Sequence, residues 1–231
     1  MIPIGDAPGY RRRFPVVMLA ILGVNVLVFV YEMSLGDRAL QQLFFSAGVV
    51  PVEYTRGREV GLPPPYHITW LTLLTSMFLH GGFLHIASNM LYLFVFGDNV
   101  EDAFGHGIFL LFYLVCGVVA SATHIVLNAS SAIPSIGASG AIAGVLAAYL
   151  VMFPQASIRT LFFLGPFFTV TRISAVFLIG FWFVTQLLAS FASLGAATEQ
   201  TSGVAVWAHV GGFVAGLVLT PFMRPPRQAF D

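Results

Sequence analysis

The chain has 231 residues, of which 58% are hydrophobic and only 9% are charged. A typical soluble domain carries about 25% charged residues, so this composition excludes a globular protein that covers its surface with charge. It predicts a multi-pass integral membrane protein that lies in the lipid bilayer. Ten basic and ten acidic residues give a net charge of zero, and the single cysteine, Cys116, excludes an internal disulfide. No nucleic-acid partner is expected.

The N-terminal part predicts a short leader followed by a first span. Residues 1–13 form a polar segment that ends in three arginines, and residues 14–31 are uncharged up to Glu32. At about 1.5 Å per residue, a helix of this length can cross a hydrocarbon core of about 30 Å. The segment lacks a small-residue cleavage site, so it is expected to be a signal anchor and not a cleaved signal peptide.

Residues 34–67 predict a long outer first loop. This segment is rich in charged residues and contains three consecutive prolines at positions 63–65. Within it, residues 39–47 have an amphipathic pattern that includes Leu40, Leu43 and Phe44. That pattern is typical of a short helix at the membrane interface.

Five further apolar segments predict five more spans. These are residues 83–96, about 104–127, 139–154, 173–192 and 204–223. The segments between them predict turns at residues 97–102 and 128–135, an interfacial loop at 155–172 and a polar loop at 194–203. The predicted fold is therefore an all-α polytopic bundle of six transmembrane helices. It forms a single membrane domain at residues 14–223, with a leader at 1–13 and a tail at 224–231.

The arginines predict how the chain crosses the membrane. With six spans, both termini lie on one side. Seven arginines fall on that side, at positions 11, 12, 13, 159, 172, 224 and 227, and three fall on the other side, at positions 38, 56 and 58. Because arginine-rich segments stay in the cytoplasm, the leader and the tail are predicted to be cytoplasmic, in a bacterial-type plasma membrane.

The stretch at residues 136–144 (IGASGAIAG) places the hydroxyl of Ser139 among glycines and alanines. A packing face of small residues on a membrane helix is the simpler interpretation. A serine nucleophile, held where backbone and substrate can come close, is the alternative. The other polar residues of the spans favour the second interpretation.

Spans two, four and six all begin at the outer face in this topology, and each carries unusual polar residues near its beginning. These residues are His85, Asn89, Ser139 and His209. All four are expected in one layer about 3–10 Å below the outer surface. Polar residues inside spans are costly and usually face a protein interior or a water-filled cavity. One of them alone is often a helix–helix hydrogen bond, but four at one depth favour a functional site.

The types of these residues favour nucleophilic catalysis. A serine hydroxyl needs a base to remove its proton, and His209 can be that base because histidine titrates near neutral pH. Attack on a carbonyl creates an oxyanion, which His85, Asn89 and the backbone N–H of Ser139 could stabilise. No acidic residue lies in this layer, so the residues allow a Ser–His dyad but no acid-containing triad. The sequence shows no metal-binding pattern, and no cofactor is expected.

Three motifs in this order resemble those of the rhomboid intramembrane serine proteases. They are His80-Gly81-x-x-x-His85-x-x-x-Asn89, Gly137-Ala138-Ser139-Gly140 and Ala208-His209-x-Gly211-Gly212-x-x-x-Gly216. The segment GDNVED at residues 97–102 is also similar to that family. The resemblance covers about residues 70–216, and the motifs are specific when they occur together.

The resemblance implies a six-helix core that is open to water from the outer face. It implies Ser139 as nucleophile, His209 as base, and His85 and Asn89 as oxyanion donors, while His80 would be structural. It also implies that Gly212 packs span six tightly against span four. The substrates would be single-spanning membrane proteins cut near a helix end. Span five and the loop at residues 194–203 would form a mobile gate and cap.

The sequence departs from the family pattern at two places. Many members carry Trp-x-Arg or Trp-Arg in the first loop, but here Trp70 is followed by Leu71 and Thr72. The first loop must therefore be anchored differently. Many members also place an aromatic residue four positions after the nucleophile, where it packs on the base. Here that position is Ala143, so another side chain is expected to hold His209.

The sequence predicts an intramembrane serine endopeptidase and leaves two alternatives. One is a catalytically inactive relative that binds membrane-protein clients, although such relatives typically lack the serine or the histidine, and both are present here. The other is a transporter or channel, which would usually show internal repeats or charged residues along a pathway. Neither feature is evident in the sequence.

Overall fold

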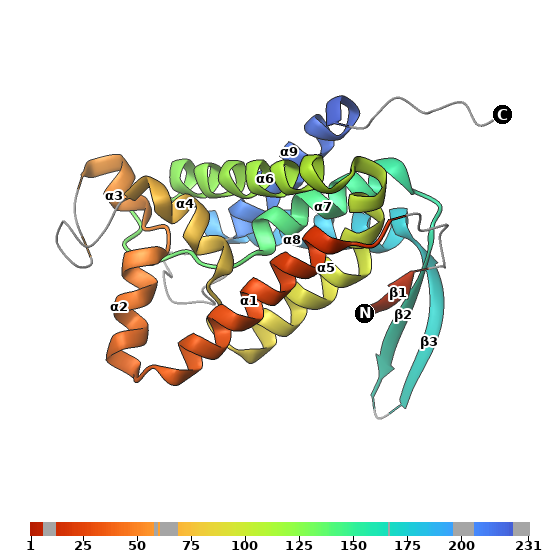
Figure 1. Cartoon of the computed structure of the whole chain (residues 1–231), viewed down its shortest axis with the longest axis horizontal. Coiled ribbons are helices and arrows are strands. Elements are labelled where there is room, and N and C mark those ends of the chain that lie inside the picture. The colour runs from red at the N-terminus through yellow and green to blue at the C-terminus, as the bar shows by residue number, and fades with distance from the viewer. Residues whose placement is uncertain (7–12, 58–59, 61–68, 166, 196–205, 224–231) are drawn as a thin grey trace.

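A computed structural model of the chain describes residues 1–6, 13–57, 60, 69–165, 167–195 and 206–223 (Figure 1). Most of these residues lie in a bundle of helices, and a small sheet lies at one end of the bundle. Several segments with predicted roles fall outside the described residues. These are Arg11 and Arg12 of the leader, Arg58, residues 196–203 of the predicted cap, and the tail at 224–231.

Six long helices lie where the sequence predicts spans. They are α1 (Val16–Ser34), α5 (Phe83–Phe104), α6 (His106–Leu127), α7 (Ser139–Met152), α8 (Ala175–Gly195) and α9 (Val206–Met223). Within the described residues, α1, α6 and α9 are each long and apolar enough to cross a membrane. The pair formed by residues 72–78 and α5, bent by 96°, would give a fourth span. The chain is therefore a helical polytopic membrane protein, while the count of six spans stays a prediction.

The described part of the predicted first loop folds into short helices at one end of the bundle. They are α2 (Asp37–Ala47) and α3 (Pro51–Arg56). The short helix α4 (Thr72–Thr75) follows the predicted loop and lies at the same end. The predicted helix at residues 39–47 is confirmed as α2. Hydrogen bonds tie this region together, since the Thr75 hydroxyl donates to the carbonyl of Ala47 at 2.7 Å. Val49 and Ser135 exchange two backbone bonds of 3.0 and 2.8 Å.

The predicted turn at residues 97–102 is wrong, because α5 continues through it to Phe104. Its polar side chains bond to other parts of the chain, and Glu101 bonds to the neighbouring helix. The buried carboxylate of Glu101 accepts the backbone N–H groups of Val17 at 2.9 Å and Met18 at 2.7 Å, and it is also hydrogen-bonded to His106. An acidic group at a helix N-terminus satisfies free N–H groups and complements the helix dipole. The chain instead turns at Gly105, whose φ is +81°.

The all-α prediction misses a three-stranded antiparallel sheet. Its strands β1 (Ile2–Asp6), β2 (Ser157–Leu164) and β3 (Phe167–Ser174) pair in the order β1-β2-β3. The predicted leader and the predicted interfacial loop thus contain strands. Residues 157–174 are rich in aromatic and β-branched residues on both sides of a Gly-Pro pair. This composition favours two strands joined by a turn, and β1 pairs with the edge of β2.

The first strand is also tied to the helices. The carboxylate of Asp6 accepts hydrogen bonds from the Asn99 side chain of α5 and, at 3.1 Å, from the Tyr149 hydroxyl of α7. Figure 1 shows β1 at the end of the bundle where α1 begins, with the β2–β3 hairpin extending beyond it.

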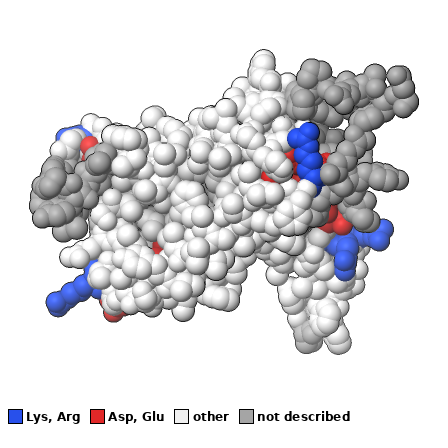
Figure 2. All heavy atoms as spheres, in the orientation of Figure 1, with Lys and Arg blue, Asp and Glu red and all other residues white. Residues whose placement is uncertain are grey.

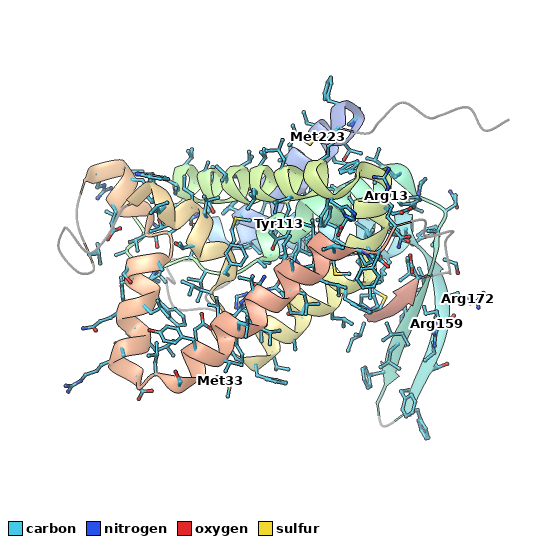
Figure 3. All side chains as sticks on the ribbon, in the orientation of Figure 1. Arg13, Met33, Tyr113, Arg159, Arg172 and Met223 are labelled. Atoms are coloured by element: carbon cyan, nitrogen blue, oxygen red, sulfur yellow. The ribbon has the colours of Figure 1, made fainter. Side chains whose placement is uncertain are left out.

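The basic side chains gather near the two ends of the long axis (Figure 2). Arg13, Arg159 and Arg172 lie at the end that carries the sheet, and Met33 lies toward the other end of α1 (Figure 3). Arg159 and Arg172 are directly opposite each other in the β2–β3 register. The sequence assigns these three arginines to the same side of the membrane, and in the structure all three lie at the same end of the bundle.

Helix α7 is the most enclosed element of the bundle, because every residue from Gly140 to Tyr149 is buried. Its backbone touches that of α9 along a seam of glycines. A Cβ added to Gly212 would collide with the carbonyl of Gly140, and one added to Gly216 would collide with the carbonyl of Gly144. A substitution here would therefore push the two helices apart, since backbone atoms cannot rotate away as a side chain can.

We expect Gly212→Ala to lower the stability of the folded protein, because overpacking a tight contact costs about 1–3 kcal/mol and this contact is with backbone. Thermal unfolding in detergent measures the effect. Gly23→Ala in α1 is the matched control, since a Cβ there meets nothing within 4 Å. The control should unfold at or slightly above the wild-type temperature. Equal unfolding temperatures for the two variants would contradict the tight seam.

Candidate active site

Ser139 is the first residue of α7, where the loop from residue 128 enters the bundle. The turn before it depends on Gly137, whose φ of +127° is rarely adopted by residues with a side chain. The N–H of Gly137 donates to the carbonyl of Ser76 at 2.8 Å, which fixes this loop to the segment before α5. No capping side chain covers the start of α7, so its first N–H groups remain available to a ligand.

His209 lies on α9 and is 6% exposed. Its Nε2 lies 2.7 Å from the hydroxyl oxygen of Ser139. The structure therefore brings the two residues of the predicted dyad into hydrogen-bonding distance, although they are far apart in the sequence. The glycine seam explains this approach, because Ser139 precedes Gly140 and His209 lies one turn before Gly212.

Two side chains of α8 hold the other sides of the His209 ring. The Oε1 of Gln186 lies 2.7 Å from Nδ1, and the Trp182 ring lies 5.9 Å from the imidazole, centre to centre, with the planes tilted by 39°. Trp182 thus contacts His209, as the aromatic residue missing at Ala143 was expected to do. The small Ala143 is fully buried within α7.

His85 lies near the start of α5 with its ring beside Ser139. Its Nδ1 accepts the N–H of Gly81 at 3.3 Å, so in the neutral ring the proton is on Nε2. That Nε2 lies next to Gly137, where an added Cβ would be 2.7 Å from Nε2 and 3.7 Å from the Ser139 hydroxyl. His85 therefore offers a donor close to the serine.

Asn89 lies one turn further along α5 and is only 6% exposed. Its side-chain nitrogen is buried without a hydrogen-bond partner among the described residues. A buried donor without an acceptor is costly, and such groups often have a functional role. Here the acceptor could be a ligand, because Asn89 lines the same cavity as the dyad.

A cavity of about 180 Å³ joins these groups. Its polar side chains come from α5, α7 and α9, and its apolar wall comes from α5, α7, α8 and the loop before α7. The lining residues are His85, Ser88, Asn89, Tyr92, Ile136, Ser139, Ile142, Leu146, Trp182 and His209. The four residues that the sequence places in one layer therefore share one cavity. Among the described residues, no group of three or more His, Cys, Asp or Glu side chains could hold a metal ion.

His80 does not line the cavity and is enclosed by other parts of the protein. It is 1% exposed, its ring meets that of His85 edge-on at 5.0 Å, and its backbone N–H donates to the Glu32 carboxylate at 3.0 and 3.3 Å. Glu32 is buried near the C-terminal end of α1. This contact anchors the segment before α5, in a sequence that lacks the expected first-loop arginine.

Sequence reasoning missed three contacts of the site, those of Gln186, Trp182 and Glu32. Gln186 carried a usable signal, because a polar residue inside a predicted span is costly and usually faces the protein interior. Its spacing from Trp182, four residues, also places both on one face of a helix. The partner of these two residues on another helix is not visible in the sequence.

Comparison with known proteins gives a consistent match. A family model described as the rhomboid domain matches residues 67–226. The Rhomboid protease GluP of Bacillus subtilis (strain 168) is 34% identical over 158 residues, which cover 68% of this chain and 27% of GluP. The mitochondrial presenilin-associated rhomboid-like protein of Mus musculus is 34% identical over 144 residues, covering 61% of this chain and 38% of that protein.

A plant relative is more distant. RHOMBOID-like protein 12, mitochondrial, of Arabidopsis thaliana is 26% identical over 175 residues, covering 69% of this chain and 48% of its own length. The chain thus spans less than half the length of each of these three relatives.

The arrangement predicts that Ser139 reacts with a fluorophosphonate probe and that this reaction needs His209. Losing a general base costs about 10²–10⁴-fold in rate, so His209→Ala should lower the labelling rate by that range. Gel fluorescence with peptide mapping measures the rate and the labelled residue. His106→Ala is the control, because the His106 ring is hydrogen-bonded to Glu101 at the α5–α6 junction and, among the described residues, to neither dyad residue. Undiminished labelling of His209→Ala would contradict the dyad.

Proposed function

Because this chain belongs to the rhomboid family, we propose that it is a serine endopeptidase that cleaves transmembrane segments of membrane proteins. The family acts on membrane-protein substrates within the lipid bilayer. The observation that carries the proposal is the 2.7 Å hydrogen bond between Ser139 and His209 beside a cavity with an unpaired amide donor. A nucleophile, its base and a donor for an oxyanion are the parts that acyl transfer needs.

In the acylation step, Ser139 Oγ attacks the carbonyl carbon of the scissile peptide bond, and His209 Nε2 accepts the hydroxyl proton. The resulting tetrahedral intermediate carries a negative oxygen. The intermediate collapses when the C–N bond breaks, and the proton on His209 passes to the leaving amine. The products are a free amine end and an ester between the substrate and Ser139.

The oxyanion would lie between three donors that come from two helices. The Asn89 side-chain nitrogen has no other partner among the described residues, and His85 presents its Nε2–H beside Gly137. The backbone N–H of Ser139 opens α7, where the helix dipole adds a positive field. Fixed donors in a site of low polarity stabilise developing charge without reorganising.

Deacylation repeats the proton transfers with water. His209 removes a proton from a water molecule, whose oxygen attacks the ester carbon, and the ester C–O bond then breaks. The proton returns to Ser139 and the carboxyl product leaves. The polar groups of Asn89 and His85 on the cavity wall provide sites for that water.

The substrates and the location follow from the same proposal. We propose single-spanning membrane proteins as substrates, cut near the end of a helix at the depth of Ser139. The predicted topology places both termini in the cytoplasm of a bacterial-type plasma membrane. The relatives include a bacterial protease and mitochondrial proteins, so the membrane itself is part of the proposal.

An inactive relative that only binds membrane-protein clients is the competing function. Such a protein has no need of a hydrogen-bonded serine and histidine at a cavity. The intact Ser139–His209 contact and the buried, unpaired Asn89 donor favour the enzyme.

We expect Ser139→Ala to reduce cleavage of a reporter transmembrane protein to background, because among the described residues only the Ser139 hydroxyl is hydrogen-bonded to His209 Nε2. Purified wild type and variant in liposomes, followed by gel analysis of the reporter, give the comparison. The unfolding temperature of the variant should match that of wild type. A variant that cleaves as fast as wild type would rule out Ser139 as the nucleophile, and an inactive wild type would favour the client-binding alternative.

We expect Asn89→Ala to be slower than wild type but measurably active, because it removes one of several oxyanion donors. Such a loss raises the barrier by about 2–4 kcal/mol, or roughly 30- to 900-fold in kcat. Ser88→Ala is the matched control on the same cavity wall, because the Ser88 hydroxyl donates to the His85 carbonyl at 2.9 Å and has no other partner within the described part of the chain. Asn89→Ala with wild-type kcat would remove Asn89 from the proposed donors.

A further inference from the structure

The imidazole of His209 is the middle of a hydrogen-bonded chain that joins three helices. On one side, Gln186 Oε1 of α8 lies 2.7 Å from Nδ1. On the other side, Nε2 lies 2.7 Å from the hydroxyl of Ser139 on α7. Gln186 is partly buried in the wall of α8 that faces α9, and no step of the proposed chemistry assigns it a role.

We propose that Gln186 is a positioning residue that keeps His209 in the tautomer needed to accept the proton of Ser139. This inference rests on the proposed protease function and deepens it. A neutral imidazole carries one ring proton, and a carbonyl oxygen can only accept a hydrogen bond. The Oε1 contact therefore holds the proton on Nδ1, which leaves a lone pair on Nε2 facing the Ser139 hydroxyl.

The opposite tautomer would be unproductive. With the proton on Nε2, the ring would donate to Ser139 Oγ and could not remove its proton. In serine proteases with an acidic third residue, the carboxylate fixes the tautomer. Here none of the residues of α7, α8 and α9 is Asp or Glu, so a carboxamide is the acceptor at this place.

A neutral acceptor suits this buried position. His209 is 6% exposed, and an unpaired carboxylate in such surroundings would carry a large desolvation penalty. An amide orients the ring at a much lower penalty. It stabilises the imidazolium less than a carboxylate would, so the role of Gln186 is orientation of the base and not charge compensation.

The second contact from α8 restricts the ring further. Trp182 is four residues before Gln186, on the same helical face, and its ring lies 5.9 Å from the imidazole. Gln186 fixes the ring at one nitrogen, and Trp182 limits its rotation from the side. The packing of α8 against α9 therefore determines whether the base points at Ser139.

Two substitutions separate this role from simple packing. Gln186→Met has a similar length but no acceptor, so kcat should fall about 10- to 100-fold, the size expected when a buried donor loses its acceptor. KM should change little, because Gln186 does not line the cavity. Gln186→Glu keeps the acceptor and should retain much more activity than Gln186→Met. A packing role predicts the reverse order, since a buried charge would disturb the fold more than a thioether.

The experiment uses the full-length protein in liposomes with a transmembrane reporter, and thermal unfolding checks each fold. Thr185→Val is the matched control on α8, because the Thr185 hydroxyl donates to the Trp182 backbone carbonyl at 2.6 Å and to no side chain among the residues that the structure describes. It should leave kcat unchanged. If Gln186→Met does not fold, Gln186→Leu replaces it with the same expectation. Wild-type kcat in a folded Met or Leu variant would overturn the inference.

A readout independent of catalysis completes the test. In protein labelled with ¹⁵N-histidine, the wild-type His209 signals should show a protonated Nδ1 and an unprotonated Nε2, with assignment from the His209→Ala spectrum. In Gln186→Met the signals should shift toward the other tautomer. Unchanged tautomer signals would overturn the inference even if the enzyme were active. A correct tautomer in a wild-type protein that cleaves nothing would instead count against the proposed protease function alone.

Discussion

The close approach of α7 and α9 is the constraint on which the proposed site depends. Their backbones touch at Gly140 and Gly212 and again at Gly144 and Gly216. A membrane provides no hydrophobic driving force between helices, so such contacts gain their stability from tight van der Waals packing. Ser139 and His209 lie at the end of this seam where α7 and α9 begin, and the distance between hydroxyl and imidazole follows from the distance between the two helix axes. Larger residues along the seam would push α7 and α9 apart and would thereby also separate Ser139 from His209.

The oxyanion side of the site depends on a different set of contacts. His85 and Asn89 lie on α5, and the segment before α5 is held by Glu32 at the backbone of His80 and by the bond between Ser76 and Gly137. Two elements, the end of α1 and the loop before α7, therefore fix where α5 begins. The first-loop arginine expected from the family is absent, and a carboxylate from α1 takes up a backbone N–H in this region. In this chain, Glu32 therefore anchors the segment that leads to the two donors of α5.

The sequence alone predicts which polar residues lie at the same depth in the bundle. It does not predict the contacts that join segments far apart in the chain. Ser139, His209, His85 and Asn89 could be placed together because their spans start at the same face. The turn predicted at residues 97–102 was wrong. A cluster of polar residues indicates exposure to solvent, but here the Glu101 carboxylate accepts backbone N–H groups at the start of α1, a contact that the sequence does not reveal. The sheet was missed because β1 and β2 pair across most of the chain. Gln186 was missed because the sequence does not show which residue of another helix its side chain contacts.

The pairing of β1 with β2 constrains the order in which the molecule can be completed. Ile2 pairs with Leu161, and Asp6 is bonded to Asn99 and Tyr149. Because β1 precedes α5, α7 and β2 in the sequence, it is synthesised before the elements that it contacts. Its backbone groups and the Asp6 carboxylate can meet these partners only when all three have been made. Strand β1 is therefore among the last parts of the described structure to be fixed in place, although it is made early, and its docking requires that the helices carrying Asn89 and Ser139 are already present.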